Sequence, residues 1–293
     1  MTHPAPTQPE SEEKVPEVEP GLTHDENKIV KESRRLRAAV VYEIIRTEGE
    51  GELKRGIPAL WWSGVAAGIS IGFSFLTQAA LSAHLPQSAW NAVIADLGYA
   101  VGFLIVILGR QQLFTENTLT AVLPVVSHRS PTWLLKMLRL WLIVLTANIV
   151  GCLLFATAIA SFDMVSTAVE NEMATIVRHL MANTQLQMFA KGIGAGWIIA
   201  ALVWMLPSSE GAEFSVIFFM TYVIALCGFT HIIAGSAEVL YGWMKGMHAL
   251  SLAVSHFFLP TLAGNVFGGT ALFAVLSYAQ VREEIKADSS AAS

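Results

Sequence analysis

Polar residues that could bind an anion or carry a proton interrupt two long apolar runs of the sequence. The first interruption, GRQQLFTEN over residues 109–117, contains Arg110 and Thr115. The second, GFTH over residues 228–231, ends in His231, and the ordinary pKa of histidine, about 6.5, suits proton exchange near neutral pH. Ionisable groups inside a membrane are costly and are usually functional. If the two runs cross a membrane, these residues predict a site for a small charged solute.

The composition indicates that the runs do lie in a membrane. The chain has 293 residues, of which 54% are hydrophobic and 14% are charged, and its mean hydropathy is +0.53. Soluble domains carry about 25% charged residues, so this deficit argues for lipid as the solvent. A membrane-crossing helix needs about 20 residues. Six apolar segments are long enough, at roughly residues 58–81, 92–113, 134–161, 187–206, 213–230 and 257–279.

Basic residues predict how these spans are oriented. Loops rich in Lys and Arg stay in the cytoplasm. Both termini are therefore expected in the cytoplasm, and the long loop 162–186 is expected outside. The basic residues that carry this argument are Lys54, Arg55, Arg129, Lys136, Arg139, Arg282 and Lys286.

The ends of the chain differ from its apolar part. Residues 1–25 are rich in Pro, Glu and Thr and are expected to be a disordered cytoplasmic tail. Residues 26–55 place apolar residues at roughly helical spacing between Arg and Lys, which predicts an amphipathic helix on the cytoplasmic membrane surface. The six-span domain is then expected over residues 56–281, followed by a cytoplasmic tail, residues 282–293.

Two sequence echoes indicate an internal repeat. Gly64-Val-Ala-Ala-Gly68 in the first span matches Gly192-Ile-Gly-Ala-Gly196 in the fourth. Asn148-Ile-Val-Gly151 in the third span matches Asn265-Val-Phe-Gly268 in the sixth. Each echo alone also fits ordinary helix packing. Because three spans per unit is an odd number, the second unit must be inverted in the membrane.

The second and fifth spans are expected to be broken. A helix from residue 92 through residue 126 would be about 52 Å long, which no bilayer accommodates. A break therefore lies within residues 109–117, with the span extending to about residue 127. Gly228 and Gly235 mark break points in the fifth span, which extends to about residue 244. Interruptions at matching positions of two repeats point to a binding site.

Three motifs together make the chain resemble the formate/nitrite transporter family over roughly residues 30–285. Leu113-Phe114-Thr115 is similar to the family's loop in the second span, and Gly228-Phe229-x-His231 is similar to its motif in the fifth. Leu259-Pro260…Gly264-Asn265-x-x-Gly268-Gly269 is similar to its sixth-span motif.

The resemblance implies an all-α, aquaporin-like membrane protein of the bacterial inner membrane. It implies a homopentamer in which each protomer has its own pore for a small monovalent anion such as formate, nitrite or hydrosulfide. Thr115 and His231 would face each other in a central chamber, and passage could be proton-linked through His231. Apolar constrictions on either side would be formed by Leu113, Phe114, Tyr99 and Phe103.

Several assignments stay open on the sequence. Lys191 either concentrates anions in the outer vestibule or anchors its helix at the interface. Arg110 either faces the pore or lies in cytoplasmic water. The aromatic residues Tyr99, Phe103 and Phe114 also fit plain packing.

The chain also departs from the family pattern. The first loop carries Arg110, Gln111, Gln112 and Glu116, the usual acid before the histidine is Thr230, and a fourth-span Asn is Gly196. These departures keep two alternatives open: a non-conducting membrane scaffold or regulator, and a channel for a neutral small solute. The chain carries no catalytic motif, so we expect no enzyme, no cofactor, no metal and no nucleic-acid partner beside the anion, the lipid bilayer and further copies of the chain.

Overall fold

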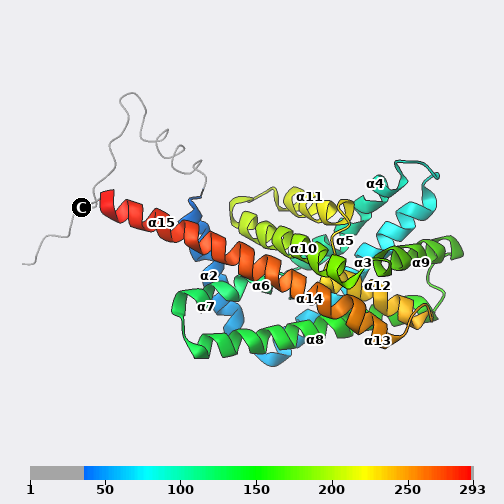
Figure 1. Ribbon diagram of the computed structural model, residues 1–293, viewed down its shortest axis with the longest axis horizontal. Coiled ribbons are helices and arrows are strands. Elements are labelled where there is room, and N and C mark those ends of the chain that lie inside the picture. The colour runs from blue at the N-terminus through cyan, green and yellow to red at the C-terminus, as the bar shows by residue number, and fades with distance from the viewer. Residues whose placement is uncertain (1–35, 292–293) are drawn as a thin grey trace, which may run out of the picture. The chain divides into compact units, whose positions relative to one another are not determined.

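Every element of the part of the chain that the structure describes is a helix (Figure 1). The structure is a computed structural model that describes residues 36–291, and the side chains of residues 36–284. The chain divides into a unit of residues 1–36 and a unit of residues 37–293. The expected disordered tail, residues 1–25, and residues 26–35 of the expected amphipathic helix lie outside the described residues.

Among the described residues, five helical stretches are long and apolar enough to cross a membrane, and they correspond to five of the six spans expected from the sequence. The other expected span, residues 213–230, contains a shorter apolar helix, Glu213–Leu226. The five stretches are α3 (Ile57–His84), the run of α4 (Asn91–Ala95), η1 (Asp96–Tyr99) and α5 (Ala100–Leu108), α8 (Pro131–Ser161), α10 (Gln185–Met205) with η2 (Leu206–Ser208), and a last run from Leu250 to Glu284. That last run joins α13 (Leu250–Leu252), η3 (Ala253–Phe258), α14 (Leu259–Val266), η4 (Phe267–Ala274) and α15 (Val275–Ala291).

The remaining helices are shorter. They are α2 (Ala38–Lys54), α6 (Asn117–Thr120), α7 (Val122–His128), α9 (Thr167–Met181), α11 (Glu213–Leu226) and α12 (Ile232–Met244). The connector 162–186, expected as a loop, contains α9, which buries Val169, Met173 and Val177 at four-residue spacing. The helix α15 runs on to Ala291, so no helix end marks the domain boundary expected at residue 281.

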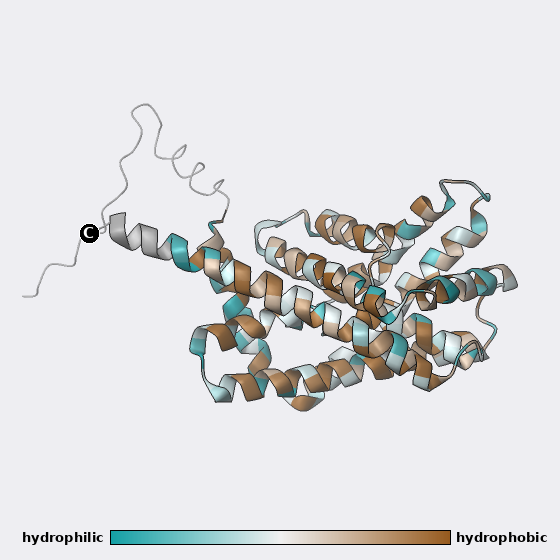
Figure 2. Cartoon of the chain, viewed as in Figure 1, coloured by the Kyte–Doolittle hydropathy of each residue, from teal (hydrophilic) through white to brown (hydrophobic). Residues whose placement is uncertain are grey.

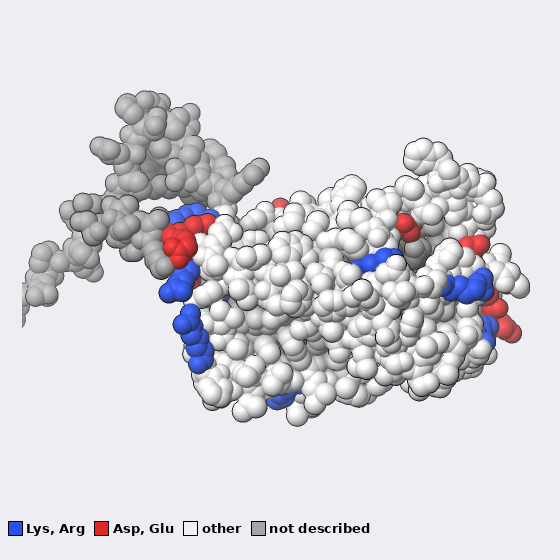
Figure 3. All heavy atoms as spheres, viewed as in Figure 1, with Lys and Arg blue, Asp and Glu red and all other residues white. Residues whose placement is uncertain are grey.

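The outer surface of the helices is largely apolar. Brown, hydrophobic residues dominate the long helices in Figure 2. Most of the face drawn in Figure 3 carries no charged side chain, and the charged atoms lie mainly toward its two ends. On α8, for example, Leu135 and Leu142 are both two-thirds exposed. Such a surface is stable only against lipid or against another apolar surface.

Glycines bring two pairs of helices into close contact. A Cβ atom at Gly68 of α3 would overlap the carbonyl oxygen of Asn148 in α8. A Cβ atom at Gly196 of α10 would overlap the carbonyl oxygen of Asn265 in α14 in the same way. Small residues allow helix backbones in membranes to approach this closely. The two sequence echoes therefore build two equivalent helix pairs.

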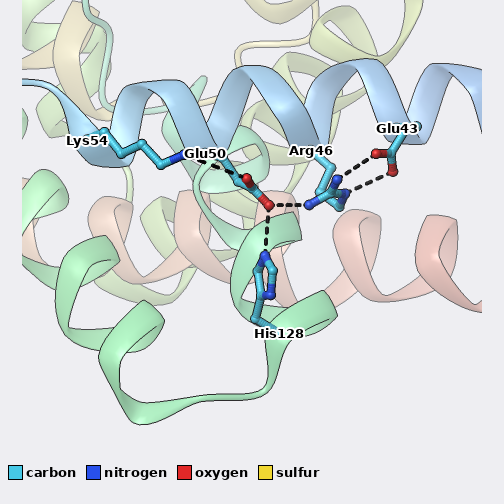
Figure 4. A network of polar contacts seen from close by, with 5 residues as sticks. All are labelled: Glu43, Arg46, Glu50, Lys54 and His128. Carbon is cyan, nitrogen blue, oxygen red and sulfur yellow. Dashed lines mark hydrogen bonds and ion pairs between the residues drawn. The ribbon is translucent and has the colours of Figure 1, made fainter.

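The helix α2 is held against α6 by close packing and against α7 by a hydrogen bond between side chains. A Cβ atom at Gly49 would overlap the carbonyl oxygen of Thr120 in α6. Glu50 accepts a hydrogen bond from Nε2 of His128 at 2.7 Å and also pairs with Arg46 (Figure 4). The hydrogen bond from His128 lowers the pKa of the Glu50 carboxyl below its ordinary value. This network fixes α2 to the segment that follows the first interruption.

Candidate functional site

The first interruption begins where α5 ends at Leu108. Arg110 adopts the left-handed conformation, with φ of 52°, and turns the chain into a loop that runs to Asn117. The side chain of Asn148 in α8 holds this loop. Its Oδ1 accepts from the Phe114 amide at 2.9 Å, and its Nδ2 donates to the carbonyl oxygens of Gly64 and Gln112 at 2.8 Å each.

The second interruption lies between Leu226, the end of α11, and Ile232, the start of α12. The chain turns at Gly228, whose φ is +60°. The side chain of Asn265 holds this loop: its Oδ1 accepts from the Ile232 amide at 2.8 Å. Its Nδ2 donates to the carbonyl oxygens of Gly192 and Thr230 at 2.9 Å each.

The two interruptions therefore use the same set of three hydrogen bonds. In each case one asparagine binds one amide and one carbonyl of the loop and one carbonyl of a glycine in a neighbouring long helix. Breaking a helix leaves backbone groups without partners, and in a membrane no water is available to replace them. The asparagines supply those partners, and this explains why the loops can be buried.

The two interruptions meet at Thr115 and His231. Oγ1 of Thr115 lies 2.7 Å from Nε2 of His231, and both residues are almost fully buried. Nδ1 of His231 accepts a hydrogen bond from the Ala234 amide at 3.2 Å. In a neutral ring the hydrogen is then on Nε2, which donates it to Thr115. The Thr115 hydroxyl keeps its own hydrogen for another acceptor.

Aromatic rings extend this contact along α5 and η1. The rings of Phe103 and His231 lie 5.0 Å apart, and those of Tyr99 and Phe103 lie 5.3 Å apart. Leu113 is fully buried beside Thr115. The ring of Phe114 instead packs against Trp141 of α8, at 5.6 Å. The structure thus brings together Tyr99, Phe103, Thr115 and His231, with Phe114 facing α8.

Phe103, Leu113 and Thr115 form a fully buried layer, which we call the buried layer. One cavity lies on the His231 side of it. It has a volume of about 270 Å³ and is lined by Tyr99, Lys191, Thr230, His231 and Glu238, among others. We call it the Lys191 cavity. Nζ of Lys191 donates to Oδ1 of Asn183 at 2.6 Å, so the ammonium group is fixed at this cavity.

A second cavity lies on the other side of the layer. It has a volume of about 260 Å³ and includes Glu48 and Glu52 of α2 and Arg110, Gln112 and Glu116 of the first interruption in its lining. We call it the Arg110 cavity. Nε2 of Gln112 donates to Oε2 of Glu52 at 2.9 Å, which ties the loop to α2.

The two cavities open at opposite ends of α10. Lys191 lines the first and Val203 lines the second, and twelve helical residues correspond to about 18 Å. Between the cavities stand Phe103, Leu113 and Thr115, which line neither of them.

Comparison with known proteins identifies the family. The model of the family described as formate/nitrite transporter matches residues 39–279. The chain belongs to this family. It is 43% identical over 249 residues to the inner membrane protein YfdC of Escherichia coli, across 85% of this chain and 80% of that one. It is 25% identical over 235 residues to the formate channel FocA of Haemophilus influenzae, across 71% of this chain and 81% of the relative.

Solved structures of the family share the fold. A pentameric formate channel with formate bound superposes with a TM-score of 0.67 at 19% identity, covering 77% of this chain and 97% of that chain. An ion channel of the formate/nitrite transporter family gives a TM-score of 0.65, covering 83% and 96%. FocA and both solved structures are described as channels, and the resemblance inferred from the three motifs is confirmed.

One residue of the site, Glu238, was not predicted from the sequence. Glu238 lines the Lys191 cavity and is 7% exposed. A signal was present, because Glu238 is the only Asp, Glu, Lys or Arg within residues 214–244 and follows His231 by seven residues. Two helical turns place both residues on one face of α12.

Proposed function

We propose that the chain forms a homopentameric channel for a small monovalent anion of the formate or nitrite type. The observation that carries this proposal is the hydrogen bond between Thr115 and His231, which joins two helix interruptions between two cavities. Such paired breaks mark the substrate site in membrane transport folds. The pentamer and the anion are carried over from the structural neighbour, a pentameric formate channel with formate bound.

The path through one protomer would run from the Lys191 cavity to the Arg110 cavity. Lys191 attracts an anion into the first cavity, and the positive end of α12, which begins after His231, lowers the cost of bringing it to the layer. The Thr115 hydroxyl donates its hydrogen to the anion. Phe103 and Leu113 form the apolar constriction that excludes water and larger ions.

We infer the topology from the same observations. Six spans form two inverted units of three, with α11 and α12 as the two pieces of the broken fifth span and α5 and α6 on either side of the break in the second. The duplicated hydrogen bonds of Asn148 and Asn265 support this arrangement. The distribution of Lys and Arg supports cytoplasmic termini, with the Arg110 cavity inside the cell and the Lys191 cavity outside, in the inner membrane.

The remaining domain assignments are also proposals. Residues 56–281 form the channel, α2 belongs to an amphipathic cytoplasmic helix, and residues 1–25 and 282–293 are cytoplasmic tails. Tyr99 and Phe114 flank the constriction, and Arg110 lies in the cytoplasmic mouth, where its exposed side chain faces the glutamates of the Arg110 cavity.

One observation supports a second candidate, a scaffold that keeps the fold without conducting. Phe103, Leu113 and Thr115 are each fully buried, so the layer between the cavities is closed. A channel opens this layer when its substrate arrives, whereas a scaffold keeps it closed.

Flux through the purified protein distinguishes these functions. The full chain is reconstituted into liposomes, and the entry of formate, of nitrite and of glycerol is followed against protein-free liposomes. The channel proposal predicts faster entry of at least one anion and no acceleration of glycerol. Glycerol entry without anion entry would identify a neutral-solute channel, and no entry of any solute through folded protein would favour the scaffold.

A further inference from the structure

Glu238 is an acidic residue on a largely buried helix, and it lines the Lys191 cavity. It is 7% exposed, and within residues 36–284 no hydrogen bond or ion pair to its carboxyl oxygens is found. Acidic side chains are almost never buried to this extent unless they are paired, and burying an unpaired carboxylate is costly. Structural stability therefore does not explain the residue. An ionisable group in a membrane span is functional by default.

Its position places it in the proposed anion path. His231, Gly235 and Glu238 all line the Lys191 cavity. Their spacing of four and three residues puts them along one face of α12. Seven residues correspond to about 10 Å along the helix, so Glu238 lies two turns from the Thr115–His231 contact.

The charged and titratable groups near Glu238 bind other residues or line the cavity without binding its carboxyl group. Lys191 of α10 shares the cavity but donates to Asn183, not to Glu238. His179 of α9 and Tyr99 of η1 also line the cavity. Asp96 accepts a hydrogen bond from Gln78 at 2.7 Å. The thiol of Cys152 in α8 faces the Ile233 carbonyl. The cavity thus holds a cation that attracts an anion and, apart from it, an acid that can give up a proton.

His231 is poorly placed to carry that proton. Both of its ring nitrogens already have partners, Thr115 at Nε2 and the Ala234 amide at Nδ1. A second proton on the ring would displace the Ala234 amide from Nδ1. It would also add positive charge at the N-terminus of α12, where the helix dipole opposes it.

We propose that Glu238 is the residue that exchanges a proton with the anion in the Lys191 cavity. This inference rests on the proposed channel function and names the group that makes the passage proton-linked. The O–H bond of protonated Glu238 breaks and an O–H bond forms on the oxyanion, which leaves a neutral acid beside the Glu238 carboxylate. The neutral acid crosses the layer of Phe103 and Leu113 at lower cost than the anion. A hydronium ion from the outer solution returns the proton to Glu238 and becomes water.

Proton-coupled flux through reconstituted full-length protein tests the proposal. Liposomes carry a pH-sensitive dye inside, formate is added outside, and protein-free liposomes correct for direct permeation of formic acid. The wild type acidifies the lumen as formate enters. Glu238→Gln, which is isosteric but carries no exchangeable acid, slows both this acidification and the accompanying formate uptake about tenfold or more. Glu238→Asp restores acidification, and the exposed Glu210→Gln serves as the matched control.

Acidification by Glu238→Gln at the wild-type rate would overturn the proposal, and so would formate entry without protons in the wild type. A second measurement does not depend on flux. Nitrite added to purified protein at fixed pH removes part of the infrared carbonyl band of protonated carboxyl groups, and Glu238→Gln lacks this change.

The two measurements separate the failure of this proposal from the failure of the channel function. If nitrite removes the band but no anion crosses the membrane, the channel function is wrong and the proton exchange stands. If anions cross, but nitrite leaves the wild-type band unchanged and Glu238→Gln acidifies the lumen at the wild-type rate, only the role of Glu238 is wrong. If neither anion flux nor a band change is seen, both proposals are wrong.

Discussion

The two helix interruptions share their hydrogen bonds but differ in their side chains. Asn148 and Asn265 make the same three contacts to the first and second interruption. The first loop is long and polar, contains Arg110, and is tied to α2 through Gln112. The second is short and ends in His231. The shared contacts solve a folding problem, while the differing side chains determine what the site does.

The loops also differ in what holds them from outside. The first depends on α2, which lies before the first span in the sequence. The second is held within the helix bundle, where the Thr230 hydroxyl donates to the carbonyl oxygen of Met188 at 2.8 Å. A change in the position of α2 would therefore act directly on the first loop and reach the second only through the Thr115–His231 contact.

The largest effect is expected from the asparagines. Asn148→Ala and Asn265→Ala each remove three buried hydrogen bonds and leave their backbone partners unsatisfied, at a cost of about 3–5 kcal/mol. Chemical unfolding in detergent measures this cost, with the exposed Asn171→Ala as control. Equal losses for both variants support the equivalence of the two loops, and a harmless change at either position would break it.

The glycine pairs should give the next largest effect. Gly68→Ala and Gly196→Ala force a methyl group onto a carbonyl oxygen, which is expected to cost about 2–3 kcal/mol each. At Gly51, in α2, a Cβ atom has no neighbour within 4 Å, so Gly51→Ala is expected to stabilise the protein by about 0.5–1 kcal/mol. Melting curves of the three variants test this. Tolerance of alanine at Gly196 but not at Gly68 would show that the two helix pairs are not equivalent.

The link between Gln112 and Glu52 distinguishes the two loops. A double-mutant cycle of Gln112→Ala and Glu52→Ala should give a coupling free energy of about 0.5–1.5 kcal/mol. The matched cycle of Thr230→Val with Glu52→Ala should give none, because the Thr230 hydroxyl binds the Met188 carbonyl of α10 rather than α2. Additive single effects at Gln112 and Glu52 would mean that α2 does not hold the first loop.

The smallest effect concerns pH and the contact of α2 with α7. Because the pKa of Glu50 is lowered in the folded protein, its pairing stabilises the fold above the ordinary glutamate pKa of about 4.3 and this contribution is lost as the pH falls through the folded pKa. Glu50→Gln should remove about 0.5 kcal/mol at pH 7 and less at pH 3. Unfolding at both pH values checks the sign, which a larger loss at pH 3 would contradict.

The sequence predicted most of the fold because apolar runs of membrane-spanning length are a strong signal. The break in the second span followed from length, since no bilayer holds a helix from residue 92 to residue 126. The break in the fifth was predicted from glycines: the chain turns at Gly228, but Gly235 was wrong as a break point because it lies inside α12. The helix α9 was missed because its apolar positions Val169, Met173 and Val177 sit among polar residues in a connector.

The parts of the site that sequence reasoning missed depend on tertiary packing. Glu238 lines the Lys191 cavity only because of the way α12 packs on its neighbouring helices, and the sequence does not show this packing. The second partner of His231 could not be predicted either, because the Ala234 amide reaches Nδ1 only after the helix break is formed.

Anion flux through variants of the contact between the two loops is the most direct test of the central claim. Formate entry is measured for reconstituted wild type, Thr115→Val, His231→Phe and the double variant, with Thr115→Ser as control. The account predicts that each single variant changes the rate by about tenfold, that the double variant is no worse than either single one, and that the Thr115→Ser variant keeps wild-type flux. Unchanged flux in the folded single variants, or effects that simply add, would contradict the claim that Thr115 and His231 form one gate.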